Sequence, residues 1–309
     1  MVGEGRLVVS LGLRLSASPK RHLPFALCLL LSAPIFYSPI EQLVDLSFHN
    51  GLYSHILLMP VLGGYFLYSK RKSIFSHSEY SLGPGVALIG IGAMLSAGCM
   101  RVFSLGRNDH LSLLTFSALL VWVGIFTVFY GFRTLGRAAF PVLFLFLMIP
   151  LPGFLTEALV GVLRKASVES VCGLFYVVGF PASRDGYVFH FPQLSIQVTE
   201  ECSGIRSFVA VAITSIVAGN LILRKGWTRL LVVIAVVPIA ILKNALRIVV
   251  ISFIAVYMGE GAFLSAFHGL VGFTIFAFFL LGLLIALLKR LEARLPHDET
   301  AMKEKVASP

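Results

Sequence analysis

Three residues of this chain have side chains that together could carry out a covalent reaction: Cys202, Arg247 and His268. A thiolate is a nucleophile that forms acyl intermediates. A guanidinium is permanently charged and can stabilise an anion, and an imidazole exchanges protons near neutral pH. The three residues stand in three successive apolar segments of the chain. They form a candidate catalytic set if the fold brings them to one depth.

Each of these residues also has an ordinary structural reading. A cysteine in an apolar protein is usually a small hydrophobic residue, an arginine near a membrane boundary can be paired or reach to water, and a lone histidine usually caps or packs. Cys202 differs from the other three cysteines because polar and charged residues surround it and an apolar helix is predicted to follow. The N-terminus of that helix and Arg206 would both favour the thiolate form.

The remaining chemistry-bearing residues indicate no cofactor. The four cysteines have no paired spacing, so we predict neither a disulfide framework nor a metal site. Cys28, Cys99 and Cys172 are interpreted as small hydrophobic residues, and the other seven histidines as packing or capping residues.

The elements that must position the candidate set are membrane helices. Of 309 residues, 57% are hydrophobic and only 13% are charged, and the hydrophobic residues form long blocks. A helix that crosses a bilayer needs roughly 20 apolar residues. The composition therefore predicts an all-α polytopic membrane protein with about eight transmembrane helices. The predicted spans are 24–40, 51–69, 83–100, 112–130, 138–152, 203–222, 229–257 and 267–288.

The long segment between the fifth and sixth spans does not resemble membrane core. Its first half, 153–180, carries four charges and is predicted to be an amphipathic helix on the membrane surface. Its second half, 187–198, alternates apolar and polar residues around Pro192-Gln193, which predicts a small β-hairpin outside the bilayer. We expect one transmembrane domain, 24–290, between cytoplasmic tails 1–23 and 291–309.

The basic residues set the orientation. With eight spans and the N-terminus inside, 17 of the 25 lysines and arginines fall in cytoplasmic segments and five in outer segments. This bias is typical of bacterial inner-membrane proteins, and it accounts for the net charge of +10 without a nucleic-acid partner. Both termini are then cytoplasmic and 153–201 is outside. A ninth span at 153–180 would reverse the last three helices and place the basic C-terminal tail outside.

This orientation places the three candidate residues near the outer boundary. Cys202 lies where the outer segment turns into the sixth span, and His268 opens the eighth. Arg247 comes twenty residues after Trp227, which corresponds to about 30 Å of helix, so it also reaches the outer edge.

Three motifs carry a resemblance to a known family. They are Glu200-Glu201-Cys202-Ser203-Gly204-Ile205-Arg206-Ser207, the Asn-x-x-Arg run that ends at Arg247, and the His-Gly-x-x-Gly-Phe run that starts at His268. Together they resemble the exosortase/archaeosortase family over residues 25 to 290. The proline-rich segment 140–152 and Tyr53-Ser54-His55 also fit. Glu201 departs from the pattern, which has a small residue there, and its carboxylate would disfavour the thiolate.

The resemblance implies a membrane cysteine transpeptidase. Its substrates would be exported proteins that end in a Pro-Glu-Pro-type motif, a transmembrane helix and a basic tail. Cys202 would form a thioester, Arg247 would stabilise the oxyanion and His268 would transfer protons. An acceptor, such as water or the amine or hydroxyl of a polysaccharide or lipid, would then resolve the thioester. Residues expected to contact the substrate or support the site are Ser54, His55, Glu200, Arg206 and Asn244.

Two other functional classes remain open from the residues alone. In a transporter or a component of polysaccharide export, Arg206, Lys243, Arg247 and His268 would line a path. In a lipid- or glycan-modifying transferase, His268 would be the base and Cys202 incidental. A transporter should place its charges near mid-bilayer and should tolerate loss of the thiol.

Overall fold

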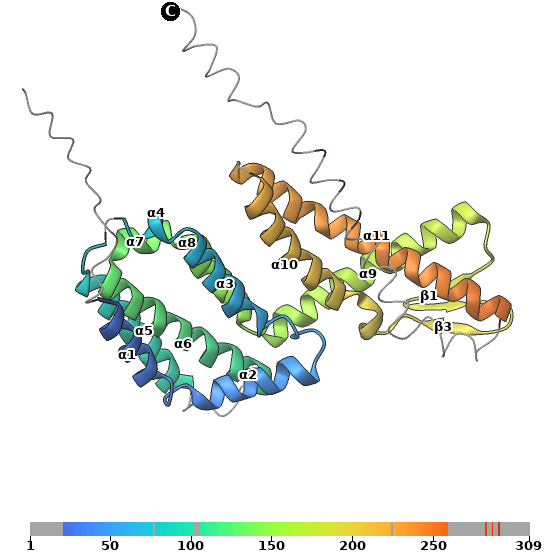
Figure 1. Cartoon of the computed structure of the whole chain (residues 1–309). Coiled ribbons are helices and arrows are strands. Elements are labelled where there is room, and N and C mark those ends of the chain that lie inside the picture. The colour runs from blue at the N-terminus through green and yellow to red at the C-terminus, as the bar shows by residue number, and fades with distance from the viewer. Residues whose placement is uncertain are drawn as a thin grey trace, which may run out of the picture. The chain divides into compact units, whose positions relative to one another are not determined.

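The computed structural model describes residues 21–76, 78–99, 101, 106–223 and 225–258, with residues 282, 286 and 290. It is mostly helical, which confirms the predicted all-α class of membrane protein (Figure 1). The chain divides into two compact units, residues 1–153 and residues 154–309, and each is described separately.

The first unit is a bundle of helices. Its elements are α1 (His22–Ser32), α2 (Tyr37–His49), α3 (Leu58–Ser69), α4 (Arg71–Ile74), α5 (Leu82–Cys99), α6 (Arg107–Tyr130), α7 (Phe132–Arg137), α8 (Ala139–Leu145) and the 3-10 turn η2 (Phe146–Met148). The buried helix α6 packs closely against α5 because glycines lie at the contact. A Cβ on Gly92 would lie 2.7 Å from the Ser117 carbonyl oxygen, and a Cβ on Gly124 would lie 2.8 Å from the Gly85 carbonyl oxygen.

The first predicted span, 24–40, is wrong as a single helix. The structure divides it into α1 and α2, which meet at a bend of 79°. Pro34 follows the end of α1 and Pro39 lies in the first turn of α2. Proline has no N–H to donate and restricts the residue before it, so it commonly ends helices and is best tolerated in their first turn.

The second predicted span, 51–69, begins later than expected. Residues 51–57 form successive turns, and α3 begins at Leu58. In these turns the Ser54 hydroxyl donates to the Gly51 carbonyl at 3.1 Å, and His55 Nδ1 lies 3.1 Å from the Leu52 carbonyl. Burial lowers the pKa of His55, while hydrogen bonds to the Leu52 and Leu147 carbonyls act in the opposite direction but less strongly. The imidazole is therefore neutral at pH 7.

The second unit combines helices with a small sheet. Its elements are α9 (Gly153–Val178), β1 (Ser183–Asp185), β2 (Val188–His190), β3 (Ser195–Gln197), the 3-10 turn η3 (Glu200–Ser203), α10 (Ile205–Ile222) and α11 (Gly226–Met258). The strands are antiparallel in the order β1-β2-β3, with Phe189 opposite both Arg184 and Ile196. The two-stranded prediction is therefore wrong in strand number. The polar run Ser183-Arg184-Asp185 lacks the alternation that marks a strand.

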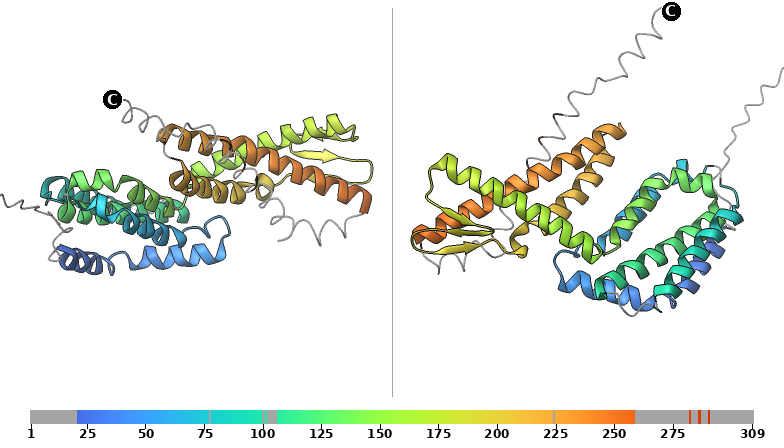
Figure 2. Two further views of the ribbon diagram at one scale, coloured as in Figure 1. Left: turned by 45° about the horizontal axis from the view of Figure 1, so that its top comes forward. Right: turned by 180° about the vertical axis from the view of Figure 1, so that it is seen from behind.

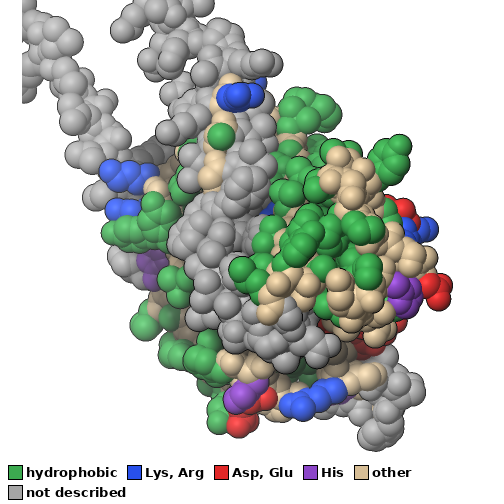
Figure 3. Space-filling model, turned by 90° about the vertical axis from the view of Figure 1, so that its right-hand side faces the viewer, with side chains coloured by type: hydrophobic (Ala, Val, Ile, Leu, Met, Phe, Trp, Pro, Cys, Tyr) green, Lys and Arg blue, Asp and Glu red, His purple; other side chains and the backbone are tan. Residues whose placement is uncertain are grey.

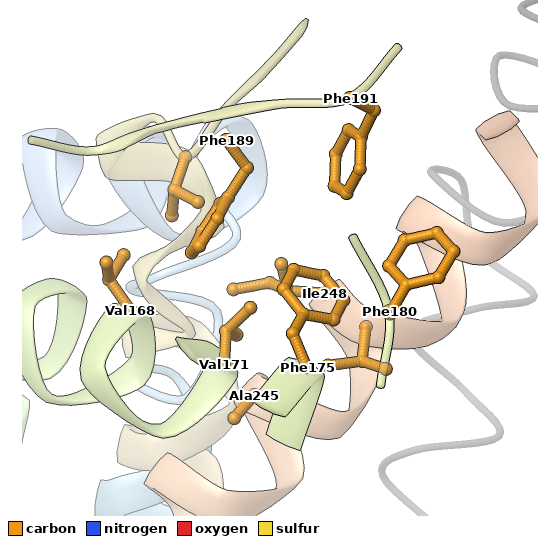
Figure 4. Close-up of a cluster of buried hydrophobic side chains, with 10 residues drawn as sticks. Val168, Val171, Phe175, Phe180, Phe189, Phe191, Ala245 and Ile248 are labelled. Atoms are coloured by element: carbon orange, nitrogen blue, oxygen red, sulfur yellow. The ribbon is translucent and has the colours of Figure 1, made fainter. Parts of the chain in front are cut away.

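An aromatic core joins the sheet to two helices. Phe175 of α9 lies with its ring centroid 5.4 Å from that of Phe189 and 5.7 Å from that of Phe191 (Figure 4). Ala245 and Ile248 of α11 belong to the same cluster. Figure 2 shows the strands lying against α9 and α11. Because the strands are only three residues long, this shared core is what fixes their position.

Four helices among the described residues are long and apolar enough to cross a membrane: α5, α6, the η3–α10 segment and α11. Counting each of two bent pairs as one span raises the number to six, so the count of eight is not reached in this part of the chain. The predicted eighth span, 267–288, lies outside the described residues apart from 282 and 286. The helix α9 has 26 residues but is not among the four by itself.

Large hydrophobic side chains are exposed on the second unit. At the ends of α9 and α11, Tyr176, Val177, Tyr257 and Met258 are all more than 70% exposed. Hydrophobic side chains also gather on the face of the chain drawn in Figure 3. Surfaces of this kind are stable where lipid or another apolar partner covers them.

The pH dependence of stability should report the buried state of His55. Below about pH 6.5 the unfolded chain takes up a proton at this residue, but the folded chain resists it. The contribution of His55 is therefore complete above the unfolded pKa and is lost as pH falls toward the lower folded pKa. In detergent, the unfolding temperature should fall less between pH 7 and pH 5 for His55→Gln than for the wild type. Equal slopes for His55→Gln and the wild type would contradict the burial of His55.

Candidate functional site

Cys202 lies in the 3-10 turn η3, between the sheet and the first residue of α10. Its N–H donates to the Thr199 carbonyl at 3.1 Å, and its half-buried side chain packs against the edge of the aromatic core. The helix itself begins at Ile205, after Gly204 as its N-cap. Cys202 therefore precedes the first helical turn instead of lying within it.

Gly204 makes the turn possible. Its φ of 80° and ψ of 10° are in the left-handed region, which costs other residues about 1–2 kcal/mol. A Cβ at this position would also lie 2.9 Å from Asn244 Cγ. The glycine in the Cys-Ser-Gly motif thus lets the chain reverse between the cysteine and α10 while passing directly against α11.

Asn244 of α11 holds the turn in place. This fully buried side chain donates from Nδ2 to the Cys202 carbonyl at 2.8 Å and to the Ser167 hydroxyl of α9 at 3.0 Å. Its Oδ1 is buried and accepts no hydrogen bond from the described residues. One amide therefore links the cysteine backbone to two helices.

A buried lysine makes a second link between α10 and α11. Lys243 is 1% exposed, and its Nζ donates to the Ser207 hydroxyl at 2.6 Å. Ser207 in turn donates to the Gly204 carbonyl at 2.9 Å. A charged group buried among apolar helices is costly and is retained where it has partners or a role. Here it fixes the first turn of α10 relative to α11.

Arg247 follows Asn244 by three residues, so the two side chains lie on one side of α11. Arg247 is half-buried, and its Nε is a buried donor without a hydrogen-bond acceptor among the described residues. Leaving such a donor unpaired costs about 1–3 kcal/mol. Cys202 is thus bonded to Asn244, and Asn244 lies on the same turn of α11 as Arg247. The guanidinium of Arg247 supplies a buried donor that the described residues leave without an acceptor.

The other predicted site residues fall into three groups. Glu200 and Glu201 lie in η3 itself and Arg206 lies in the first turn of α10, and all three are exposed. Ser54 and His55 belong to the first unit, so their relation to Cys202 stays a prediction. His268 lies outside the described residues, and its role also stays a prediction. Among the residues that the structure describes, no cluster of three potential metal ligands occurs.

The sequence did not predict that Ser167, Ser207 and Lys243 would support the site. Ser167 lies 77 positions from Asn244, and Ser207 lies 36 positions from Lys243, so no local pattern pairs them. The one available signal was the Lys243-Asn244 pair of polar residues within an apolar helix.

Replacing Gly204 with alanine should lower stability. The variant combines a left-handed backbone with a contact against the buried Asn244 side chain, so we expect a loss of more than about 1 kcal/mol in thermal or denaturant unfolding. Gly173→Ala is the matched control, because this exposed α9 glycine has open space around it. Alanine there should be neutral or stabilising. If the two variants unfold alike, the Gly204 turn described above is not formed.

Comparison with known families identifies the family of the chain. The model of the transmembrane exosortase family (Exosortase_EpsH) matches residues 47–285, which is more than half of the chain and includes Cys202, Arg247 and His268. Comparisons with curated proteins and with solved structures gave no match. The resemblance seen in the sequence motifs is thereby confirmed, and the chain belongs to the transmembrane exosortase family.

Proposed function

We propose that this chain is a membrane-embedded cysteine transpeptidase that cleaves the C-terminal sorting signals of exported proteins. The observation that carries the proposal is the tie between Cys202 and α11. The Asn244 amide holds the Cys202 carbonyl at 2.8 Å, and the same turn of α11 carries Arg247, whose buried Nε has no acceptor among the described residues. The hydrogen bond of Asn244 thus holds the nucleophile of η3 close to the turn of α11 that carries a donor for developing negative charge.

The reaction proceeds in two steps. The Cys202 thiol gives its proton to His268 and its sulfur attacks the scissile carbonyl, and the oxyanion that forms is stabilised by the Arg247 guanidinium. The C–N bond then breaks, the leaving amine takes a proton from His268, and a thioester remains on Cys202. Water, or an amine or hydroxyl of a polysaccharide or lipid acceptor, gives its proton to His268 and attacks the thioester. The acyl group passes to the acceptor and the thiol is restored.

The bilayer assists this reaction by setting the depth of both partners. In the proposed topology, eight spans place both termini in the cytoplasm of a bacterial cell and the Cys202 turn at the outer face of its inner membrane. A substrate that carries its own transmembrane helix presents the preceding residues at the same face. The scissile bond then reaches Cys202 without a large binding cleft outside the membrane.

Loss of the thiol should stop processing. In cells that make a protein with a Pro-containing motif, an apolar helix and a basic tail, Cys202→Ala should leave this substrate uncleaved in the membrane fraction. Cys172→Ala is the matched control, because Cys172 is also half-buried against the same core. Immunoblots should show the shortened form in the wild type and the control only. Wild-type processing by Cys202→Ala would refute the transpeptidase and favour an export component.

The shape of the arginine side chain should matter as well as its charge. Arg247→Lys keeps the charge but loses the forked donor, so the cleavage rate should fall by about 10²-fold or more. His268→Ala should be comparably damaging. Arg229→Lys is the control on the same helix, where the guanidinium donates to the Leu223 carbonyl and should affect local structure alone. A fully active Arg247→Lys variant would show that only the charge is used.

A further inference from the structure

Among the described strands, β3 lies at one edge of the sheet and directly precedes the turn that holds the proposed nucleophile. In the described part of the chain it is the last strand of the sheet, and its Ser195 and Gln197 side chains are exposed. The Val198 N–H donates to the Tyr187 carbonyl, and the Phe191 N–H donates to the Leu194 carbonyl. In an antiparallel pair these bonds fall on alternate residues. The backbone groups of Ser195 and Gln197 therefore point away from β2, toward the free edge.

The strand β3 is close in the chain to the proposed nucleophile and to the helix that follows it. Only four residues separate Gln197 from Cys202, and α10 begins three residues after Cys202. The chain thus passes from an extended strand through the nucleophile into an apolar helix. A substrate that also passes from an extended motif into a transmembrane helix would run in the same direction, with its scissile bond level with Cys202.

Arg164 lies at the C-terminal end of β3, and its guanidinium is held in place by two contacts. Arg164 of α9 donates from Nε to the Val198 carbonyl at 2.7 Å, and its Cζ lies 3.9 Å from the centre of the Tyr187 ring. These contacts hold the guanidinium while its terminal nitrogens have no hydrogen-bond acceptor among the described residues. An ordered, half-buried guanidinium is suited to bind a carboxylate through paired donors.

We propose that β3 is the docking strand for the substrate: an acidic, extended peptide segment pairs in parallel with its free edge, and Arg164 binds the acidic side chain. The proposal rests on the proposed function, because it takes Cys202 as the nucleophile. Exposed Glu200 and Glu201 directly precede the cysteine and would repel a second acid there. The acidic residue of the substrate therefore lies on the N-terminal side of its scissile bond, level with the end of β3.

This mode of binding imposes a period of two on the substrate. Along a strand, only every second residue turns its N–H and C=O toward a given neighbour. Proline has no N–H and is tolerated on an edge strand where that position faces away. A segment with prolines on both sides of one acidic residue can therefore pair through the acidic residue and leave both prolines outward.

The first test separates the backbone donor from the side chain. Gln197→Pro removes one outward N–H, whereas Gln197→Ala removes the side chain and keeps the donor. The probe is a synthetic peptide with one Pro-Glu-Pro segment, an apolar helix of about 20 residues and a lysine tail. Binding is measured in detergent to both variants, each combined with Cys202→Ala. We expect Kd to rise by about tenfold or more for proline and to stay near the parent value for alanine.

The second test reads the register from the substrate side. In a probe whose two prolines are replaced with alanine, single amide-to-ester replacements at successive positions each remove one peptide N–H. Binding to the Cys202→Ala protein should weaken most at every second position, where the removed N–H faces β3, and much less at those between, where only the preceding carbonyl becomes a weaker acceptor. Equal weakening at all positions, or weakening at none, would overturn the docking strand, because a structural change in the enzyme cannot produce a period of two.

The third test concerns Arg164. Arg164→Gln should weaken binding of the glutamate probe by about tenfold and leave binding of the matching glutamine probe unchanged. Equal losses for both probes would show that Arg164 only supports the Val198 carbonyl, and would overturn its role in recognition. The double comparison isolates the charge pair from any general effect of the substitution.

The outcomes also distinguish this proposal from the proposed function. If the wild type cleaves the peptide, and Gln197→Pro and the ester series change neither Kd nor kcat/KM, the docking strand is wrong and the transpeptidase stands. If the ester series shows a period of two but the wild type never cleaves, the docking strand stands and the transpeptidase is wrong.

Discussion

The hydrogen bonds of Asn244 are the constraint on which the second unit depends. This amide is 1% exposed on a largely apolar helix, and it joins α11 to the Cys202 carbonyl and to Ser167 of α9. In apolar surroundings a polar group without a partner is costly, so the partners are held in a narrow range of positions. The same contact forces glycine at position 204, since a Cβ there would meet the amide. The Cys-Ser-Gly run and the asparagine of the next helix are thus two halves of one interaction.

Around this amide, some polar groups bond to one another and fix the structure, whereas two others have no partner among the described residues. Lys243 and Ser207 satisfy one another and fix the start of α10. Asn244 Oδ1 and Arg247 Nε are buried and have no partner among the residues that the structure describes. Both lie on the turn of α11 that is bonded to Cys202. A proposed substrate that brings its own donor and acceptor to this place would gain hydrogen bonds that the described residues leave unmade.

The sequence predicted those helices whose presence depends only on the length of an apolar block. The helices α5, α6, α10 and α11 follow from long apolar blocks, and the candidate residues Cys202, Asn244 and Arg247 follow from polar residues within or next to such blocks. The bend before α2 was missed because composition records how apolar a block is but not whether Pro34 ends a helix within it. The strand β1 was missed because its three polar residues pair through backbone groups, which any sequence can supply. The Ser167 contact depends on folding across 77 positions, so no sequence period contains it.

Two kinds of interaction hold the second unit together, apolar contact and hydrogen bonds, and each positions a different part of it. The aromatic core of Phe175, Phe189 and Phe191 fixes the strands through contact area, which tolerates small shifts. The cysteine turn is fixed by hydrogen bonds, which do not. Because β3 is joined to the turn by only two residues, Val198 and Thr199, the core also limits where the turn can lie. A helix alone would satisfy its own backbone and leave no edge to pair. In the proposed docking mode, the sheet keeps backbone groups of β3 available beside a thiol whose position the polar contacts have already set.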